Sequence, residues 1–180
     1  MRALERGAIA LASLALSIGL IALLSGFFAS HDTGGLSGQA SGPGQSFPDQ
    51  GDAVLAPGQL RPPYNSDPPT SGPHVPKVVT RDGVALSDDQ LLSALSRGNV
   101  VLLYSGRSAP AALRTLASSL AGPFAPALAA AGQAVILSPR RGTSGIVAVA
   151  WNHLLRTPRP TDPGLREFVS FWLGRVALRQ

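Results

Sequence analysis

An uncharged apolar run near the N-terminus constrains this chain more than any other feature. Residues 8–29 contain only Ala, Leu, Ile, Ser, Gly and Phe. As a helix the run would extend roughly 33 Å, enough to cross a hydrocarbon core of about 30 Å. A cleaved signal peptide is the alternative, but its apolar region usually has only about 7–15 residues. Residues 27–30, Phe-Phe-Ala-Ser, also lack a small-x-small cleavage pattern, so residues 8–29 predict an uncleaved transmembrane helix.

The charges on either side of this run predict its orientation. Arg2 and Arg6 precede it, and no further Lys or Arg occurs until Arg61. The positive-inside rule then keeps residues 1–7 in the cytoplasm and places residues 30–180 outside. We therefore expect a single-pass cell-membrane protein that contacts the lipid bilayer through residues 8–29.

Composition divides the rest of the chain into two parts. Residues 30–60 are rich in Gly, Ser, Pro and Gln and have few apolar side chains. Such a segment buries too little surface to offset the entropy lost on ordering, which predicts a flexible linker. Residues 61–180 carry periodic apolar patterns and are the predicted extracytoplasmic domain.

The patterns within residues 61–180 predict the order α-β-α-β-β-α. Ser87 and Gln90 form a capping box before a helix that ends at Gly98. The following elements are a strand at 100–104, a helix capped by Ser108, a short helical piece through Leu128, strands at 134–137 and 146–151, and a helix from Asp162 to Val176. This order predicts a small two-layer α/β sandwich. By analogy alone, its last five elements follow a thioredoxin-like order.

Composition also excludes several classes of function. The chain has no cysteine, so disulfide scaffolds, thiolate metal sites and redox CxxC chemistry are excluded. The net charge of +5 favours anionic partners, but the arginines are scattered and no basic helix or zinc-finger spacing occurs. We predict no cofactor and no nucleic-acid partner. An unidentified protein or an anionic ligand of the cell envelope is the expected partner.

The most specific string is Tyr64-Asn-Ser-Asp-Pro-Pro-Thr-Ser-Gly-Pro-His74. It resembles the signature of domain-of-unknown-function family 3105, bacterial proteins typically anchored by one N-terminal helix. The resemblance extends over residues 60–175 and includes the strand ending at Tyr104 and the pair Ala150–Trp151. It implies that the signature contains the site candidates, which are Tyr64, Ser66, Pro68, Pro69, Thr70, Ser71, Gly72 and His74.

One part of the family pattern is changed in this chain. The resemblance implies a helix reading Leu-Val-His-x-Leu-Glu-His-Gly, and here residues 91–98 read Leu-Leu-Ser-Ala-Leu-Ser-Arg-Gly. Ser93, Ser96 and Arg97 thus replace a His-x-x-Glu-His motif whose spacing could hold a metal ion. Arginine is not a metal ligand at ordinary pH, and its charge repels cations. We therefore predict a degenerate site face at these three residues, with no metal bound.

The histidines separate the two functional hypotheses. His31 is expected to be solvated and His153 to lie in a surface loop, whereas His74 ends the signature segment. The leading hypothesis is a non-enzymatic binding or assembly module with a degenerate family site. The alternative is a metal-handling protein or a hydrolase-like enzyme that uses His74 with unidentified partners. The sequence predicts no catalytic residue and does not identify the ligand.

Overall fold

The computed structural model describes residues 42–56 and 58–175. The predicted transmembrane run at 8–29 and most of the predicted linker therefore lie outside the described residues. Among the residues that are described, no helix is both long enough and apolar enough to cross a membrane. Gly42 is the first residue of the compact unit that contains the domain.

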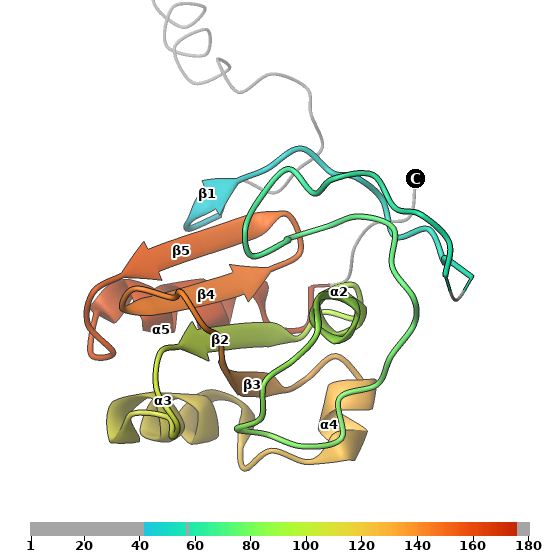
Figure 1. The fold of residues 1–180 in the computed structure, drawn as a ribbon. Helices are drawn as coiled ribbons and strands as arrows, with labels where there is room; N and C mark the ends of the chain where they lie inside the picture. The colour runs from blue at the N-terminus through green and yellow to red at the C-terminus, as the bar shows by residue number, and fades with distance from the viewer. Residues whose placement is uncertain (1–41, 57, 176–180) are drawn as a thin grey trace, which may run out of the picture. The chain divides into compact units, whose positions relative to one another are not determined.

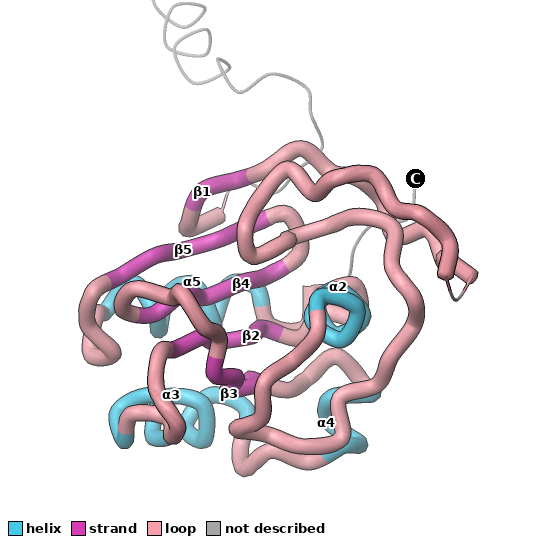
Figure 2. Tube along the Cα trace, viewed as in Figure 1, coloured by secondary structure: helices cyan, strands magenta, loops and turns pink. Residues whose placement is uncertain are grey.

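One five-stranded sheet organises the described chain (Figures 1 and 2). The strands are β1 (Gln45–Ser46), β2 (Val100–Tyr104), β3 (Val135–Pro139), β4 (Ile146–Ala150) and β5 (His153–Thr157). Their order across the sheet is β1-β5-β4-β2-β3. Only β2 and β3 are parallel, and the other neighbours are antiparallel. The structure is thus a mixed α/β fold.

Within residues 42–56 and 58–175, four helices cover both faces of the sheet. They are α2 (Asp88–Leu95), α3 (Ala111–Ala121), α4 (Pro126–Ala130) and α5 (Pro163–Trp172). Side chains of α3 and α5 pack on one face, and those of α2 and α4 pack on the other. The architecture therefore has three layers rather than the predicted two. The physical reason is visible in β2, where all five residues are buried because both of its faces are covered.

The helix ends show where local sequence signals were sufficient. The capping box is confirmed, since the Ser87 hydroxyl accepts from the Gln90 N–H and the Gln90 side chain accepts from the Ser87 N–H. Gly98 follows α2 with a φ of +103°, a conformation that favours glycine. Ser96 and Arg97 lie in the turn after α2 rather than inside it. For α3 the predicted Ser108 cap is wrong, because Pro110 occupies the N-cap position and no side chain caps the helix.

Two further predictions differ from the structure. Residues 42–56 pack on the domain instead of belonging to a flexible linker: Leu55 is buried, and β1 pairs with β5. The segment is retained because Trp172 Nε1 donates to the Pro43 carbonyl at 2.9 Å and Phe47 N donates to the Asn152 carbonyl at 2.8 Å. In addition, β5 was missed, since its turn at residues 151 and 152 contains neither Gly nor Pro to mark a hairpin.

Candidate functional site

The signature segment is held between two parts of the chain that are distant in sequence. On one side, Gly72 N and His74 N donate to the carbonyls of Gly51 and Ala53, at 2.8 and 3.1 Å. On the other side, Asn152 N donates to the Thr70 carbonyl at 3.0 Å. The end of the signature therefore has a fixed backbone, although it contains no regular helix or strand.

Most hydroxyl groups of the signature take part in this internal framework. Ser66 Oγ accepts from Thr70 N at 3.1 Å and lies 3.2 Å from Thr70 Oγ1. Ser71 Oγ accepts from Gln50 N at 3.1 Å. Thr70 and Ser71 are completely buried, and Pro68 and Pro69 are buried beside them. These contacts and this burial give five signature residues a structural role in the loop: Ser66, Pro68, Pro69, Thr70 and Ser71.

Tyr64 and Gly72 form a close contact that requires glycine. Gly72 has a φ of +131°, and a Cβ atom built there would lie 2.9 Å from the Tyr64 ring. The Tyr64 hydroxyl donates to the Pro73 carbonyl at 3.1 Å and accepts from Arg61 Nη1 at 2.7 Å. Burial of the phenol raises the pKa of Tyr64 and outweighs the effect of Arg61. The Tyr64 ring packs against the buried cluster on the α2/α4 face of the sheet.

His74 is buried, and its surroundings determine which ring nitrogen carries the proton. The side chain is 4% exposed, and Nδ1 lies 3.0 Å from the Gly72 carbonyl. Because a carbonyl oxygen only accepts hydrogen bonds, Nδ1 carries the proton. In the neutral ring Nε2 then keeps its lone pair, and the described residues provide it with no hydrogen-bond partner.

The segment after His74 is fastened along α2. Lys77 N donates to Ser93 Oγ at 3.0 Å, and Val75 N donates to Asp89 Oδ1 at 3.2 Å. Asp89 also pairs with Lys77 Nζ at 2.9 Å and with Arg61 at 3.0 Å. Burial alone would raise the pKa of Asp89, but the bonds from Lys77 and Val75 and the charge of Arg61 outweigh burial and lower it. This network brings His74 beside the helix.

His74, Ser93, Ser96 and Arg97 line one hollow of about 580 Å³, which we call the polar chamber. Its other lining residues are Asp52, Ala53, Val54, Pro76, Ala130 and Ala131. The structure thus brings His74 together with all three residues of the predicted degenerate face. Ser66, Thr70 and Ser71 are not part of the described lining.

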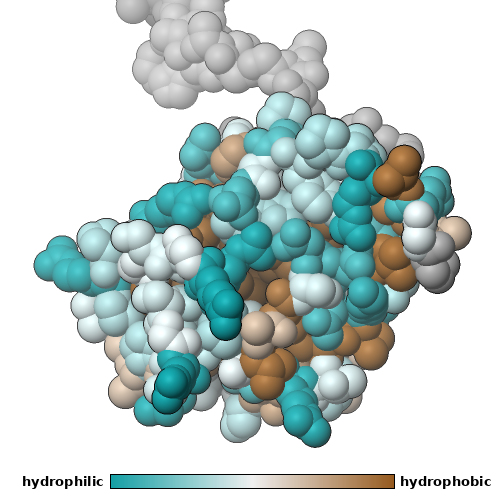
Figure 3. Space-filling view, viewed as in Figure 1, coloured by the Kyte–Doolittle hydropathy of each residue, from teal (hydrophilic) through white to brown (hydrophobic). Residues whose placement is uncertain are grey.

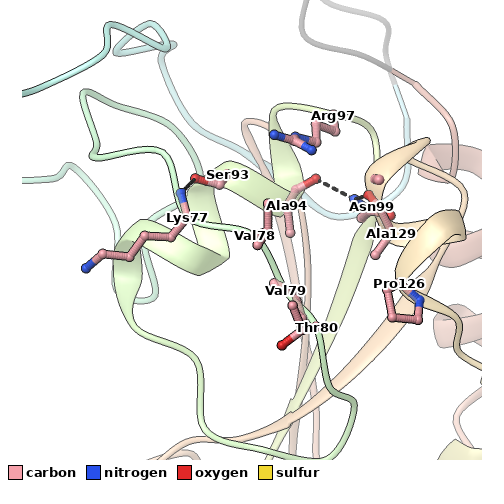
Figure 4. Close-up of a pocket in the computed structure, with 11 residues that line it drawn as sticks. Lys77, Val78, Val79, Thr80, Ser93, Ala94, Arg97, Asn99, Pro126 and Ala129 are labelled. Atoms are coloured by element: carbon pink, nitrogen blue, oxygen red, sulfur yellow. Dashed lines mark hydrogen bonds between the residues drawn. The ribbon is translucent and has the colours of Figure 1, made fainter.

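A second hollow, which we call the apolar cleft, adjoins the polar chamber between α2 and α4 (Figure 4). Its volume is about 230 Å³, and it shares Ser93, Arg97 and Ala130 with the chamber. Its remaining lining is Lys77, Val78, Val79, Thr80, Ala94, Asn99, Pro126 and Ala129. Figure 3 shows apolar side chains at the surface on the side of α2 and α4, where Val78 is 61% exposed.

Asn99 is a structural residue of this site that the sequence analysis did not identify. Its side-chain nitrogen donates to the carbonyls of Ala94 and Ala129, at 3.0 and 2.8 Å, and its oxygen accepts from Ala134 N at 2.9 Å. It therefore joins the end of α2 to α4 and to the start of β3. The only available signal was an asparagine between a helix stop and a buried strand.

His153 does not lie in a surface loop as predicted. It is 4% exposed in β5, and its ring stacks on Trp172 with a centroid distance of 3.7 Å. Burial lowers the pKa of His153, although the Nδ1 contact with the Trp151 carbonyl at 2.9 Å acts in the opposite direction. This side chain belongs to the packing on the α5 side and not to the polar chamber.

Comparison with known proteins identifies the family of this chain. Residues 59–176 match the family model described as "Protein of unknown function (DUF3105)". The match covers more than half of the chain and includes the signature, α2 and the sheet, so the protein belongs to this family. No curated protein and no solved structure matches the chain. Among the described residues, no three His, Asp or Glu side chains come together in a group that could hold a metal ion.

Proposed function

We propose that the protein is a binding or assembly module and that the polar chamber is its binding site. The observation that carries this proposal is the meeting of His74 with Ser93, Ser96 and Arg97 around one hollow. These side chains come from the signature segment and from the end of α2, two regions that the network around Asp89 holds together. A hollow with hydrogen-bonding groups from both the signature segment and the end of α2 suits recognition of a ligand.

The charge of the chamber supports binding over metal chemistry. Arg97 keeps its positive charge at all physiological pH values and repels a metal cation near His74. The resemblance to the family implies that His, Glu and His occupy positions 93, 96 and 97 in other members. In this chain two hydroxyls and a guanidinium replace them. The Ser96 hydroxyl donates to the Ser93 carbonyl at 3.4 Å, which leaves the Ser93 hydroxyl and the Arg97 guanidinium as donors for an anion or a carbonyl.

A second function is favoured by the state of His74. With Nδ1 protonated by its contact with the Gly72 carbonyl, Nε2 is available as a base or as a metal ligand. This is the metal-handling or hydrolase-like alternative, with His74 as the reactive group. It requires additional groups from a bound substrate or from residues outside those described.

Metal-dependent stability distinguishes the two functions. The full-length protein would be unfolded thermally in detergent with a chelator, with no addition, and with a modest excess of zinc. A metal bound only to the native state stabilises it by RT ln(1 + [L]/Kd) and therefore raises Tm. The binding module, which holds no metal, is expected to show the same Tm in all three conditions. A Tm that zinc raises and that His74→Ala makes insensitive to zinc would support the alternative. Ser96→Ala is the matched control, since it changes the chamber without removing a ligand.

We also propose that residues 8–29 anchor this module in the cell membrane with the domain outside. The support is the uncharged run with Arg2 and Arg6 before it and no Lys or Arg after it until Arg61. A reporter that is active only outside the cytoplasm, fused after Gln180, should be active. An inactive reporter, together with a cytoplasmic reporter active at the same position, would contradict this topology.

We propose further that β2 through α5 form a thioredoxin-like unit. Support comes from the parallel β2–α3–β3 crossover followed by the antiparallel β4–β5 hairpin and α5. The chain has no cysteine, so such a unit would serve as a scaffold here rather than in thiol chemistry. An experimental structure with a different strand order would contradict this assignment.

A further inference from the structure

The polar chamber and the apolar cleft meet at a shared wall. Ser93, Arg97 and Ala130 line both hollows. The chamber adds the polar side chains of Asp52, His74 and Ser96, whereas the surface that the cleft exposes is mainly apolar. We propose that the two hollows together bind an organic anion with one carboxylate head and a short apolar chain. This inference deepens the proposed function and rests on it, because it names the class of ligand for the same site.

The shared wall supplies donors for the head. Arg97 is exposed, and the described residues provide its guanidinium with neither an ion pair nor a hydrogen bond. A guanidinium binds a carboxylate through two parallel hydrogen bonds. Ser93 Oγ accepts from Lys77 N and therefore keeps its own hydroxyl hydrogen for donation. The carboxylate of the ligand would therefore lie beside Ser93 and Arg97.

The surrounding charges favour a head with a single negative charge. The Lys77 ammonium points away from the cleft and pairs with Asp89 (Figure 4). A phosphate monoester has a charge of about −1.5 to −2 at pH 7, which one guanidinium does not balance, whereas a carboxylate has a single negative charge. One arginine therefore matches one carboxylate.

The apolar cleft accommodates the chain. Val78 and Val79 line one side, and Pro126 and Ala129 line the other (Figure 4). Both side-chain hydrogens of the Asn99 amide are used by the Ala94 and Ala129 carbonyls, so its nitrogen offers no further donor to a ligand. With about 30 Å³ for each small group, a cleft of about 230 Å³ holds about eight non-hydrogen atoms. The chain of octanoate beyond its carboxylate, about seven carbons, fits this volume.

The test is a calorimetric titration of the full-length protein in lipid nanodiscs with octanoate. Empty nanodiscs, titrated in parallel, correct for partitioning of octanoate into lipid. Acetate keeps the head without the chain, octanol keeps the chain without the charge, and octyl phosphate changes the head. We expect octanoate to bind at least 100-fold more tightly than acetate and at least tenfold more tightly than octanol and octyl phosphate.

Two variants connect this binding to the proposed residues. Arg97→Gln removes the charge from an exposed position, and Ala130→Phe fills the cleft from its exposed rim. Each should weaken octanoate binding at least tenfold while leaving Tm within a few degrees. Arg107→Gln is the matched control, since Arg107 is also exposed but follows the opposite end of β2. It should leave octanoate binding unchanged.

Several outcomes would overturn the assignment. Equal binding of octanoate and octanol would show that the head is not recognised, and equal binding of acetate would show that the cleft is unused. Tighter binding of octyl phosphate would exclude the carboxylate head. Absence of octanoate binding, with a Tm that zinc leaves unchanged, would reject this ligand class but retain the binding module. A zinc-dependent Tm lost in His74→Ala would reject the proposed function itself.

Discussion

The two faces of the sheet are covered by different kinds of structure. On the α3/α5 face, two helices of more than two turns each bury aromatic and aliphatic side chains, including Phe168 and Trp172. On the α2/α4 face, a two-turn helix, a five-residue helix and the segment from Phe47 to Ser87 provide the cover. There the segments are fastened by the polar groups of Asp89, Ser93 and Asn99.

This difference separates stability from recognition within one small domain. Aliphatic and aromatic side chains fill space efficiently and leave few voids larger than a water molecule. Short helices and loops joined by directional hydrogen bonds leave room between them, and both the polar chamber and the apolar cleft lie on this side. The α3/α5 face therefore mainly stabilises the domain, and the α2/α4 face contains the candidate site.

A matched pair of phenylalanines tests this division most strongly. Phe168→Ala empties a fully buried position on the α3/α5 face and should lower the free energy of unfolding by about 3–5 kcal/mol. Phe124→Ala, on the α2/α4 face, removes a half-buried ring and should cost only about 1–2 kcal/mol. Denaturant unfolding followed by tryptophan fluorescence measures both losses. Equal losses would show that the two faces contribute alike.

Asn99→Ala should produce the next largest effect. It removes three buried hydrogen bonds at once and leaves two carbonyls and one N–H without these partners, at an expected cost of about 2–3 kcal/mol. Amide exchange at Ala134 should also accelerate, because that N–H loses its acceptor. Asn65→Ala, which removes an exposed amide, is the matched control and should cost less than about 1 kcal/mol. Similar losses in the two variants would argue against Asn99 as the link between α2 and α4.

The smallest expected difference between the two faces is in how the free energy of unfolding depends on pH. The folded-state pKa of His153 is lowered by burial, so the unfolded chain takes up its proton first as the pH falls. Stability should therefore decrease as the pH falls through about 6.5, the ordinary pKa of histidine. His153→Phe keeps a ring against Trp172 and should flatten this part of the profile. An unchanged slope in that variant would assign the effect to another group.

The stability contribution of the α2/α4 face should change in a separate, more acidic pH range. The folded-state pKa of Asp89 is lowered, so its contribution is present above the ordinary value of about 3.9 and is lost as the pH falls through the folded value. Asp89→Asn should remove this acidic loss and leave the decrease near pH 6.5 unchanged. The contribution is modest, because Lys77 and Arg61 are partly exposed to solvent. Loss of both transitions in one variant would mean that the faces are coupled.

Parts of this structure could be predicted because their signals are local. The Ser87–Gln90 capping box and Gly98 define α2 within a few residues, and the buried run at 100–104 defines β2. The signature residues from Tyr64 to His74 were sufficient to indicate the family that the match over residues 59–176 shows. In contrast, β5 lacked a turn signal, and His153 was therefore placed in a loop instead of the core.

The sequence by itself determined α2, β2 and the family, because caps, periodic apolar positions and short motifs act between residues close together in the chain. Only the tertiary structure decided that residues 42–56 pack on the domain and that His74 meets Ser93 and Arg97. These arrangements depend on hydrogen bonds between segments distant in the chain, such as Gly72 N to the Gly51 carbonyl and Lys77 N to Ser93 Oγ. Composition predicted disorder for residues 42–56, since their few apolar side chains cannot order them alone. They become ordered because the sheet edge and the signature segment satisfy their backbone groups.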